Sequence, residues 1–309
     1  MTESASRPFH EITSGLRFPE GPIAMPDGSV ILVEIERGTL TRVMPDGEKI
    51  VIAHTAGGPN GAAIGPDGKC YVCNNGGFKW HEEGGLLRPV LQADDYSGGR
   101  IERIDLDTGD VEVLYRGLEG KPLKGPNDIV FDQHGGFWFT DLGKVRARDQ
   151  DRGAVYYARA DGSLLVEVIQ PMVHPNGIGL SPDGDTLYVA ESLTGRLWAF
   201  EITGPGEIRR QPWPSPNGGR LVVGMPNYQL FDSLAVEACG NVCVATLVKG
   251  AVSVLTPEGE LVEQVLFPDH YVTNICFGGA DRKTAYITLS HSGRLIAVDW
   301  ARPGLALAH

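Results

Sequence analysis

One repeated pattern constrains the fold of this chain more than any other feature. In six segments, the last of them weaker, a polar residue follows an apolar or Pro-bearing approach and precedes a hydrophobic strand, a Gly-containing turn and a second strand. The polar residues that begin the repeats are Glu20, Asn60, Asn127, Asn176, Asp232 and Asn274. Each of them offers a side-chain oxygen, so the repeat indicates both a fold and a site.

The spacing of the repeats predicts a β-propeller. Successive repeat starts lie 40, 67, 49, 56 and 42 residues apart, and propeller blades span roughly 40 to 50 residues. PDG and other Gly-rich turns separate short runs of β-branched and aromatic residues, and no segment has a helical period. We therefore expect residues 1–309 to form a single all-β domain, a six-bladed β-propeller with almost no helix.

The propeller geometry also predicts where the repeat starts lie. The first strand of every blade lines the central channel, so equivalent residues converge on one axis although they are far apart in sequence. We expect the six oxygen-bearing side chains to surround one channel mouth. Ring closure needs strands from both ends of the chain in one blade, and residues 10–17 beside residues 293–300 are the expected pair.

Two stretches are longer than a blade requires. Residues 74–100 account for the wide gap between Asn60 and Asn127, and they are polar and rich in glycine. Loops of this length are usually functional or mobile, so we interpret this one as a lid or wall over the channel mouth; a hairpin that decorates the rim is the alternative. Residues 203–230 are a candidate for a second excursion, which leads to Asp232.

Composition excludes several classes of function. The chain has 27 basic and 39 acidic residues, a net charge of −12, and no basic stripe, so we expect no nucleic-acid partner. No apolar stretch approaches the length of a membrane span, and the first residues lack the apolar core of a signal peptide. We expect a cytoplasmic protein, either a monomer or a weak homo-oligomer.

The sequence shows no motif for a serine nucleophile, a nucleotide cofactor or a cysteine-bound zinc ion. The chain has no GxSxG elbow for a serine nucleophile and no Gly-rich phosphate loop for a nucleotide cofactor. Cys70 and Cys73 form a C-x-x-C, but residues three apart in a strand face opposite sides of a sheet and do not grip one zinc ion. We therefore expect the five cysteines to be free thiols.

The repeats resemble those of a known family. The chain is similar to the gluconolactonase, senescence-marker protein and luciferin-regenerating enzyme family over residues 16–300, in segments that read PEGPIAMPDG, PNDIVFDQHGGFWFTD, HPNGIGLSPDGDTLYVAES and FDSLAVEACGNVCVAT. The resemblance implies a six-bladed propeller with one divalent metal ion at the channel mouth. Several members of the family are sugar lactonases, so it also implies a lactone substrate.

The resemblance implies a set of metal ligands. Glu20, Asn176 and Asp232 match the glutamate, asparagine and aspartate that bind the metal in the family, although Ser233 follows the aspartate where the family more often has glycine. Two carboxylates and an amide oxygen suit Ca²⁺ first, with Mn²⁺, Mg²⁺, Zn²⁺ or Fe²⁺ as alternatives. Asp and Asn at strand starts also cap turns through the backbone, which is the structural alternative for each ligand.

The substrate contacts are less directly implied. Asn127 matches an asparagine that faces substrate and metal, but the family often has an arginine two residues before it, where this chain has Gly125. We assign Lys124 to replace that arginine, with Arg100 or the inserted loop as alternatives. Further candidates for substrate contact are Asn60, Trp80 and Tyr228, and His174 is a candidate for the wall of the mouth or for a structural rim position.

These residues together predict a divalent-metal-dependent hydrolase that opens a lactone ring, with a sugar aldonolactone or a related small lactone as substrate. In this hypothesis the metal polarises the carbonyl and Asp232 assists the attacking water as the catalytic residue. Two alternatives stay open. One is a propeller that binds calcium or a small ligand without turnover, and the other is a metal-dependent esterase or phosphotriesterase on the same site.

Overall fold

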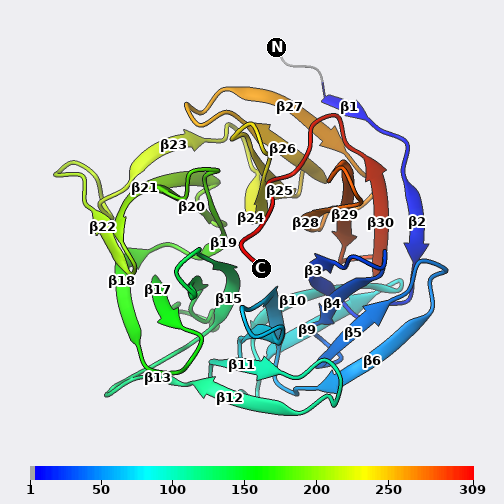
Figure 1. The fold of residues 1–309 in the computed structure, drawn as a ribbon, viewed down its shortest axis with the longest axis horizontal. Coiled ribbons are helices and arrows are strands. Elements are labelled where there is room, and N and C mark those ends of the chain that lie inside the picture. Colours follow the sequence, from blue (N-terminus) through cyan, green and yellow to red (C-terminus); the bar gives the residue numbers. More distant parts are fainter. Residues whose placement is uncertain (1–3) are drawn as a thin grey trace.

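The computed structural model describes residues 4–309 and confirms the six-bladed propeller. Six sheets of four or five strands are arranged around a central axis (Figure 1). No helix occurs between residues 4 and 309, and this range accordingly holds no helix that could cross a membrane. The blades follow one another in chain order around the ring.

The first three blades begin at successive repeat starts. Blade 1 consists of β3 (Pro19–Ala24), β4 (Val30–Glu34), β5 (Thr39–Val43) and β6 (Lys49–His54). Blade 2 consists of β7 (Pro59–Ile64), β8 (Cys70–Asn74), β11 (Arg100–Ile104) and β12 (Val111–Tyr115). Blade 3 consists of β15 (Pro126–Phe131), β16 (Gly136–Asp141), β17 (Gly153–Arg159) and β18 (Leu165–Met172).

The other three blades carry the additional edge strands. Blade 4 consists of β19 (Pro175–Leu180), β20 (Thr186–Glu191) and β21 (Arg196–Gly204), whose outer edge pairs with both β22 (Glu207–Arg209) and β23 (Arg220–Gly224). Blade 5 consists of β24 (Leu230–Val236), β25 (Val242–Leu247), β26 (Ala251–Leu255) and β27 (Leu261–Leu266). Blade 6 consists of β28 (Val272–Gly278), β29 (Thr284–Leu289) and β30 (Arg294–Asp299), with an outer strand from the N-terminal region.

The N-terminal region closes the ring as the sequence predicts. Strand β2 (His10–Thr13) pairs antiparallel with β30, with His10 opposite Ala297. Strand β1 (Ser4–Ser6) adds a parallel strand to the outer edge of blade 5, beside β27. Both ends of the chain therefore contribute to blade 6, and a neighbouring segment ties it to blade 5.

Adjacent blades pack face to face through apolar side chains. Between blades 3 and 4, for example, Trp138 and Tyr157 lie in one buried cluster with Ile178, Leu187 and Trp198. The β-branched and aromatic residues that gave the strand signal thus fill the spaces between sheets. Of the five cysteines, all of them free, three are buried, one is half-buried and Cys239 is exposed.

The inner strands approach one another closely around the channel. In three repeats a glycine follows the polar repeat-start residue. A Cβ built on Gly21 would lie 2.7 Å from the carbonyl oxygen of Asn60 in the next blade, and one built on Gly177 would lie 2.6 Å from that of Asp232. Real side chains do not approach backbone this closely, so only glycine permits this spacing between the blades.

The insertion of residues 74–100 forms a hairpin at the mouth where the inner strands begin. Strands β9 (Phe78–Glu83) and β10 (Leu86–Gln92) connect β8 to β11, and Asn74 at the end of β8 lies opposite Pro59 at the start of β7. The Leu87 amide donates to the carbonyl of His291 in blade 6 at 2.9 Å. The hairpin therefore leans from blade 2 over the mouth (Figure 1).

The remaining short elements lie on the periphery or at the other mouth. Strands β13 (Gly117–Leu118) and β14 (Lys121–Pro122) form a small hairpin before blade 3. Within residues 203–230, Trp213 is 89% exposed. After blade 6 the chain returns to the centre (Figure 1), where the Leu305 amide donates to the Val236 carbonyl and the His309 ring meets Phe131 at 5.7 Å.

The glycine spacing predicts a local stability effect. We expect Gly177→Ala to lower the free energy of unfolding by about 1 to 3 kcal/mol, the usual cost of overpacking, as measured by denaturant unfolding. Gly224→Ala is the matched control, because its Cβ would have only the Arg196 side chain nearby, at 3.7 Å, and no positive φ. Equal stability of the two variants would contradict a close-packed ring.

Candidate metal-binding site

The structure places the six repeat-start residues at equivalent positions near the start of the inner strands. They lie on β3, β7, β15, β19, β24 and β28, and their exposed fractions range from 3% for Glu20 to 8% for Asp232. Six oxygen-bearing side chains are thus withdrawn from water at one level of the channel. Such groups are tolerated only with partners, so their contacts decide what the ring can bind.

Glu20 is held by donors from its own blade and from blade 6. The Asn274 amide nitrogen donates to Glu20 Oε2 at 2.7 Å, and the Gly21 backbone amide donates to the same oxygen at 2.7 Å. Burial nevertheless raises the pKa of Glu20 to about 7. Asn274 therefore orients this carboxylate, but the hydrogen bonds do not fully offset the cost of burying its ionised form.

Asp232 lies next to Asn176 and within the electrostatic range of Glu20. Burial raises the pKa of Asp232 well above its usual range, the negative charge of Glu20 raises it further, and a hydrogen bond from Asn176 lowers it in part. The amide nitrogen of Asn176 also donates to Ser192 Oγ at 3.1 Å. That contact leaves the amide oxygen of Asn176 available, apart from a long 3.5 Å contact with Ser233 Oγ.

Asp128 is a third channel carboxylate that the sequence analysis missed. It is 7% exposed, and its Oδ1 accepts from the Ile129 amide at 3.0 Å. Burial, together with the charge of Glu20, raises the pKa of Asp128 to about 8. A signal for it was present, because Asp128 occupies the repeat position at which blades 1, 2 and 4 have glycine.

The donor set fits a hard divalent cation. Glu20 and Asp232 are acidic side chains held away from water with incomplete compensation, and a cation would stabilise their ionised forms. Asn127 is 4% exposed, and its side-chain oxygen has no hydrogen-bond partner among residues 4–309. In the same range no three His, Cys, Asp or Glu side chains are close enough to hold a metal by themselves. A metal ion at the ring would therefore need an amide oxygen, such as that of Asn176, beside the carboxylates.

The predicted substrate residues lie in different surroundings. Asn60 is buried at its ring position on β7, whereas Lys124 is exposed, and its backbone amide donates to Asp141 at 2.7 Å. Trp80 packs on the ring of Phe18 at 5.2 Å and so holds the hairpin to blade 1. Tyr228 is 73% exposed.

Gly125 and Arg100 bear on the arginine that the family often has two residues before the position of Asn127. A side chain does not fit at Gly125, because its Cβ would lie 2.5 Å from the Gly143 carbonyl oxygen. Arg100 is buried and paired with Glu102 at 2.6 Å, and it also donates to the Thr55 carbonyl. Arg100 is therefore used within blade 2 and is not free to bind a substrate.

The ring separates two regions of the channel. Beyond it, toward the turns that end the inner strands, lies a cavity of about 840 Å³ lined by Asp128, Ile178 and Asn274 and, at its far end, by residues 305–309. The β9–β10 hairpin lies at the mouth where the inner strands begin. A molecule bound at the ring therefore faces either the β9–β10 hairpin or this inner cavity.

Comparison with known proteins agrees with the fold and identifies the family. The family model described as the SMP-30/Gluconolactonase/LRE-like region matches residues 18–291, and the chain belongs to this family. It is 28% identical over 244 residues to the lactonase drp35 of Staphylococcus epidermidis, covering 78% of this chain and 67% of that protein. It is 24% identical over 316 residues to the gluconolactonase of Zymomonas mobilis, covering 93% and 80% of the two chains.

A solved structure supports the same architecture. The calcium-binding protein regucalcin of Agrobacterium tumefaciens superposes with a TM-score of 0.74 at 19% identity, over 99% of this chain and 100% of that one. At this identity the likeness establishes the fold. The match of the family model to residues 18–291 confirms the resemblance to this family found in the sequence.

The raised carboxyl pKa values predict how pH affects the metal-free protein. In the folded state Glu20 and Asp128 bind protons up to pH about 7 and about 8, whereas their ordinary pKa values are 4.5 and 3.8. Through these two groups the folded state holds more protons between these limits, so their contribution to the free energy of unfolding falls as pH rises from about 5 to about 8. Denaturant unfolding in a chelator measures this slope.

Variants and metal test the origin of the slope. Asp128→Asn should flatten it, while Asp161→Asn, at an exposed turn carboxylate, should leave it unchanged over this range. Saturating Ca²⁺ should raise stability most at the higher pH, because the ion binds the deprotonated carboxylates. A pH slope that is the same in Asp128→Asn as in the parent protein would contradict this interpretation of the ring.

Proposed function

We propose that this protein is a divalent-metal-dependent hydrolase that opens the ring of a small lactone. The observation that carries the proposal is the buried pair of carboxylates, Glu20 and Asp232, with Asn176 beside them at one level of the channel. Membership of a family that includes lactonases supports the reaction class. We further propose Ca²⁺ as the ion, in keeping with the calcium-binding relative of the same fold.

In this proposal Glu20, Asn176 and Asp232 hold the ion. When bound, it supplies a Lewis acid that polarises the lactone carbonyl and stabilises negative charge on the carbonyl oxygen. Asn274 keeps Glu20 in place through its 2.7 Å hydrogen bond. The Asn127 side-chain oxygen, which has no partner in residues 4–309, accepts a hydrogen bond from the substrate or from the attacking water.

Asp232 is the proposed base. One of its oxygens accepts a proton from the water as the water oxygen attacks the carbonyl carbon, the ring C–O bond breaks, and the proton passes to the departing alkoxide to give a hydroxy acid. Burial raises the pKa of Asp232, which makes it a better proton acceptor, while a nearby cation lowers the pKa again. The two effects oppose each other and favour a base that works near neutral pH.

A test of the function uses metal-stripped protein and a panel of sugar and aliphatic lactones. Returning Ca²⁺, Mn²⁺, Mg²⁺, Zn²⁺ or Fe²⁺ should restore hydrolysis, and Asp232→Asn should lower kcat by at least about a hundredfold, the usual contribution of a general base. Glu20→Gln should weaken metal binding, measured by calorimetry. Glu201→Gln, at an exposed outer-strand carboxylate, is the control and should behave as the parent protein.

The same experiment separates the alternatives. Tight metal binding with no turnover of any lactone would favour a propeller that binds calcium or a small ligand without catalysis. Full lactonase activity in Asp232→Asn with metal bound would exclude the proposed base. Turnover of aryl esters or phosphotriesters in preference to lactones would move the assignment to that reaction on the same residues.

A further inference from the structure

Buried polar atoms without partners gather on one side of the channel mouth. Within residues 4–309 three such side-chain atoms occur, Asn75 Nδ2, Asn127 Oδ1 and His174 Nε2. They belong to the hairpin root in blade 2, to the inner strand of blade 3 and to the approach to blade 4. An unmade buried hydrogen bond costs about 1 to 3 kcal/mol, so their location in three successive blades indicates a place for a polar ligand.

Lys144 interacts with two of these three residues, Asn75 and His174. Its side chain is buried with the residue 1% exposed, and Nζ donates to Asn75 Oδ1 and to the Gly77 carbonyl, both at 2.9 Å. Nζ also lies 4.1 Å from the centre of the Phe78 ring. Its positive charge acts on His174 as well, since it helps to lower the pKa of that histidine. Lys144 therefore lies between the hairpin root and blade 4.

Lys144 has no anionic partner in contact. Both acceptors of its ammonium group are neutral, it forms no ion pair among the described residues, and an ammonium group has a third proton to donate. Burial lowers the pKa of Lys144 to about 7, although the negative charges of Asp141 and Asp151 act in the opposite direction. A buried amine with an unused donor is a ready partner for an oxyanion.

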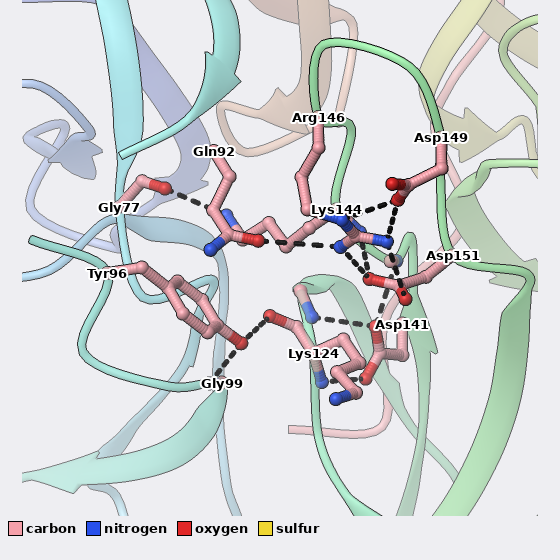
Figure 2. A network of polar contacts seen from close by, with 12 residues as sticks. Gly77, Gln92, Tyr96, Gly99, Lys124, Asp141, Lys144, Arg146, Asp149 and Asp151 are labelled. Carbon is pink, nitrogen blue, oxygen red and sulfur yellow. Dashed lines mark hydrogen bonds and ion pairs between the residues drawn. The ribbon is translucent and has the colours of Figure 1, made fainter. Parts of the chain in front are cut away.

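The nearby carboxylates are already used by other groups. Asp141 accepts from the backbone amides of Lys124 and Gly125, both at 2.7 Å. Asp151 accepts from the guanidinium of Arg146 at 2.9 Å and from the backbone amide of Lys144 at 3.1 Å. Figure 2 shows these contacts around Lys124, Asp141 and Lys144. Neither carboxylate forms an ion pair with the ammonium group, although the charges of both raise its pKa.

We propose that Lys144 Nζ, Asn75 Nδ2 and His174 Nε2, in the tautomer with its proton on Nε2, bind a carboxylate that the lactone substrate carries. This inference rests on the proposed function and narrows the substrate class to anionic lactones. The glycine at position 125 leaves no room for a side chain, so recognition of the substrate moves to the loop that follows β16. The local positive charge also offsets the net charge of −12, which otherwise repels an anion.

The test compares two lactones of nearly equal shape, γ-butyrolactone γ-carboxylate and its neutral γ-carboxamide. The parent protein should favour the carboxylate, chiefly through a lower KM. Lys144→Met should lower kcat/KM for the carboxylate about ten- to a hundredfold, as expected for loss of a charge-assisted hydrogen bond, and change that for the carboxamide less than about threefold. Lys79→Met removes an exposed charge from the same hairpin and should change neither.

A second variant, Asn75→Asp, tests the same site through its effect on stability. Asn75→Asp keeps the oxygen that accepts from Lys144 and adds a carboxylate where the unpartnered Nδ2 now lies. We expect a higher melting temperature, because the buried ammonium gains a counterion, together with loss of the preference for the carboxylate lactone. Unchanged carboxamide hydrolysis shows that such a variant is folded and competent.

Binding measurements keep this inference separable from the proposed function. If no lactone is hydrolysed, the lactonase proposal fails, and calorimetry with the two intact lactones then tests the anion site alone. Tighter binding of the carboxylate by the parent, lost in Lys144→Met, would support the site. Equal binding of both lactones, or an equal loss of both activities in Lys144→Met, would overturn it and leave Lys144 as a structural tie to the hairpin.

Discussion

The close approach of six inner strands around one channel is the constraint on which the rest of the structure depends. At this level a Cβ on Gly177 would meet the backbone of the next blade at 2.6 Å, so there is space for only a few side chains. Those that occupy it, including Glu20 and Asp232, are buried and oxygen-rich. The geometry that closes the propeller thereby gathers acidic side chains at one point, where a bound cation would offset the cost of burial.

The region around the mouth holds a buried cation, Lys144. The β9–β10 hairpin is held to blade 1 by Trp80 and to blade 6 by the Leu87 amide. On its other side Lys144 is buried beneath the hairpin root without a contacting anion. A substrate that combines a lactone carbonyl with a carboxylate would complement both regions at once, with its carbonyl at the ring and its anion at Lys144.

Some parts of this arrangement were accessible to sequence reasoning because they repeat. The polar repeat starts, the turn signals and the closing segment near His10 all follow from blade periodicity, and the structure has them where expected. Asp128 was missed because the repeat was defined by the polar residue itself, and the residue that follows is glycine in only three of the six copies. Lys144 carried no signal at all, since a lysine in a polar loop after a strand is ordinarily solvated, and only the packing of the hairpin over it removes it from water.

The sequence by itself determined the blade count and the positions of the ring residues, because alternation and spacing act locally and recur six times. The family followed from the resemblance of the repeat motifs. Tertiary structure alone decided which side chains were left without partners. Arg100 forms an ion pair with Glu102 within its own blade. Lys144 and Asn75 are 69 residues apart in the sequence and come into contact only in the folded chain. Burial and pairing depend on contacts between distant segments, and these are set by the closed ring and not by any local pattern.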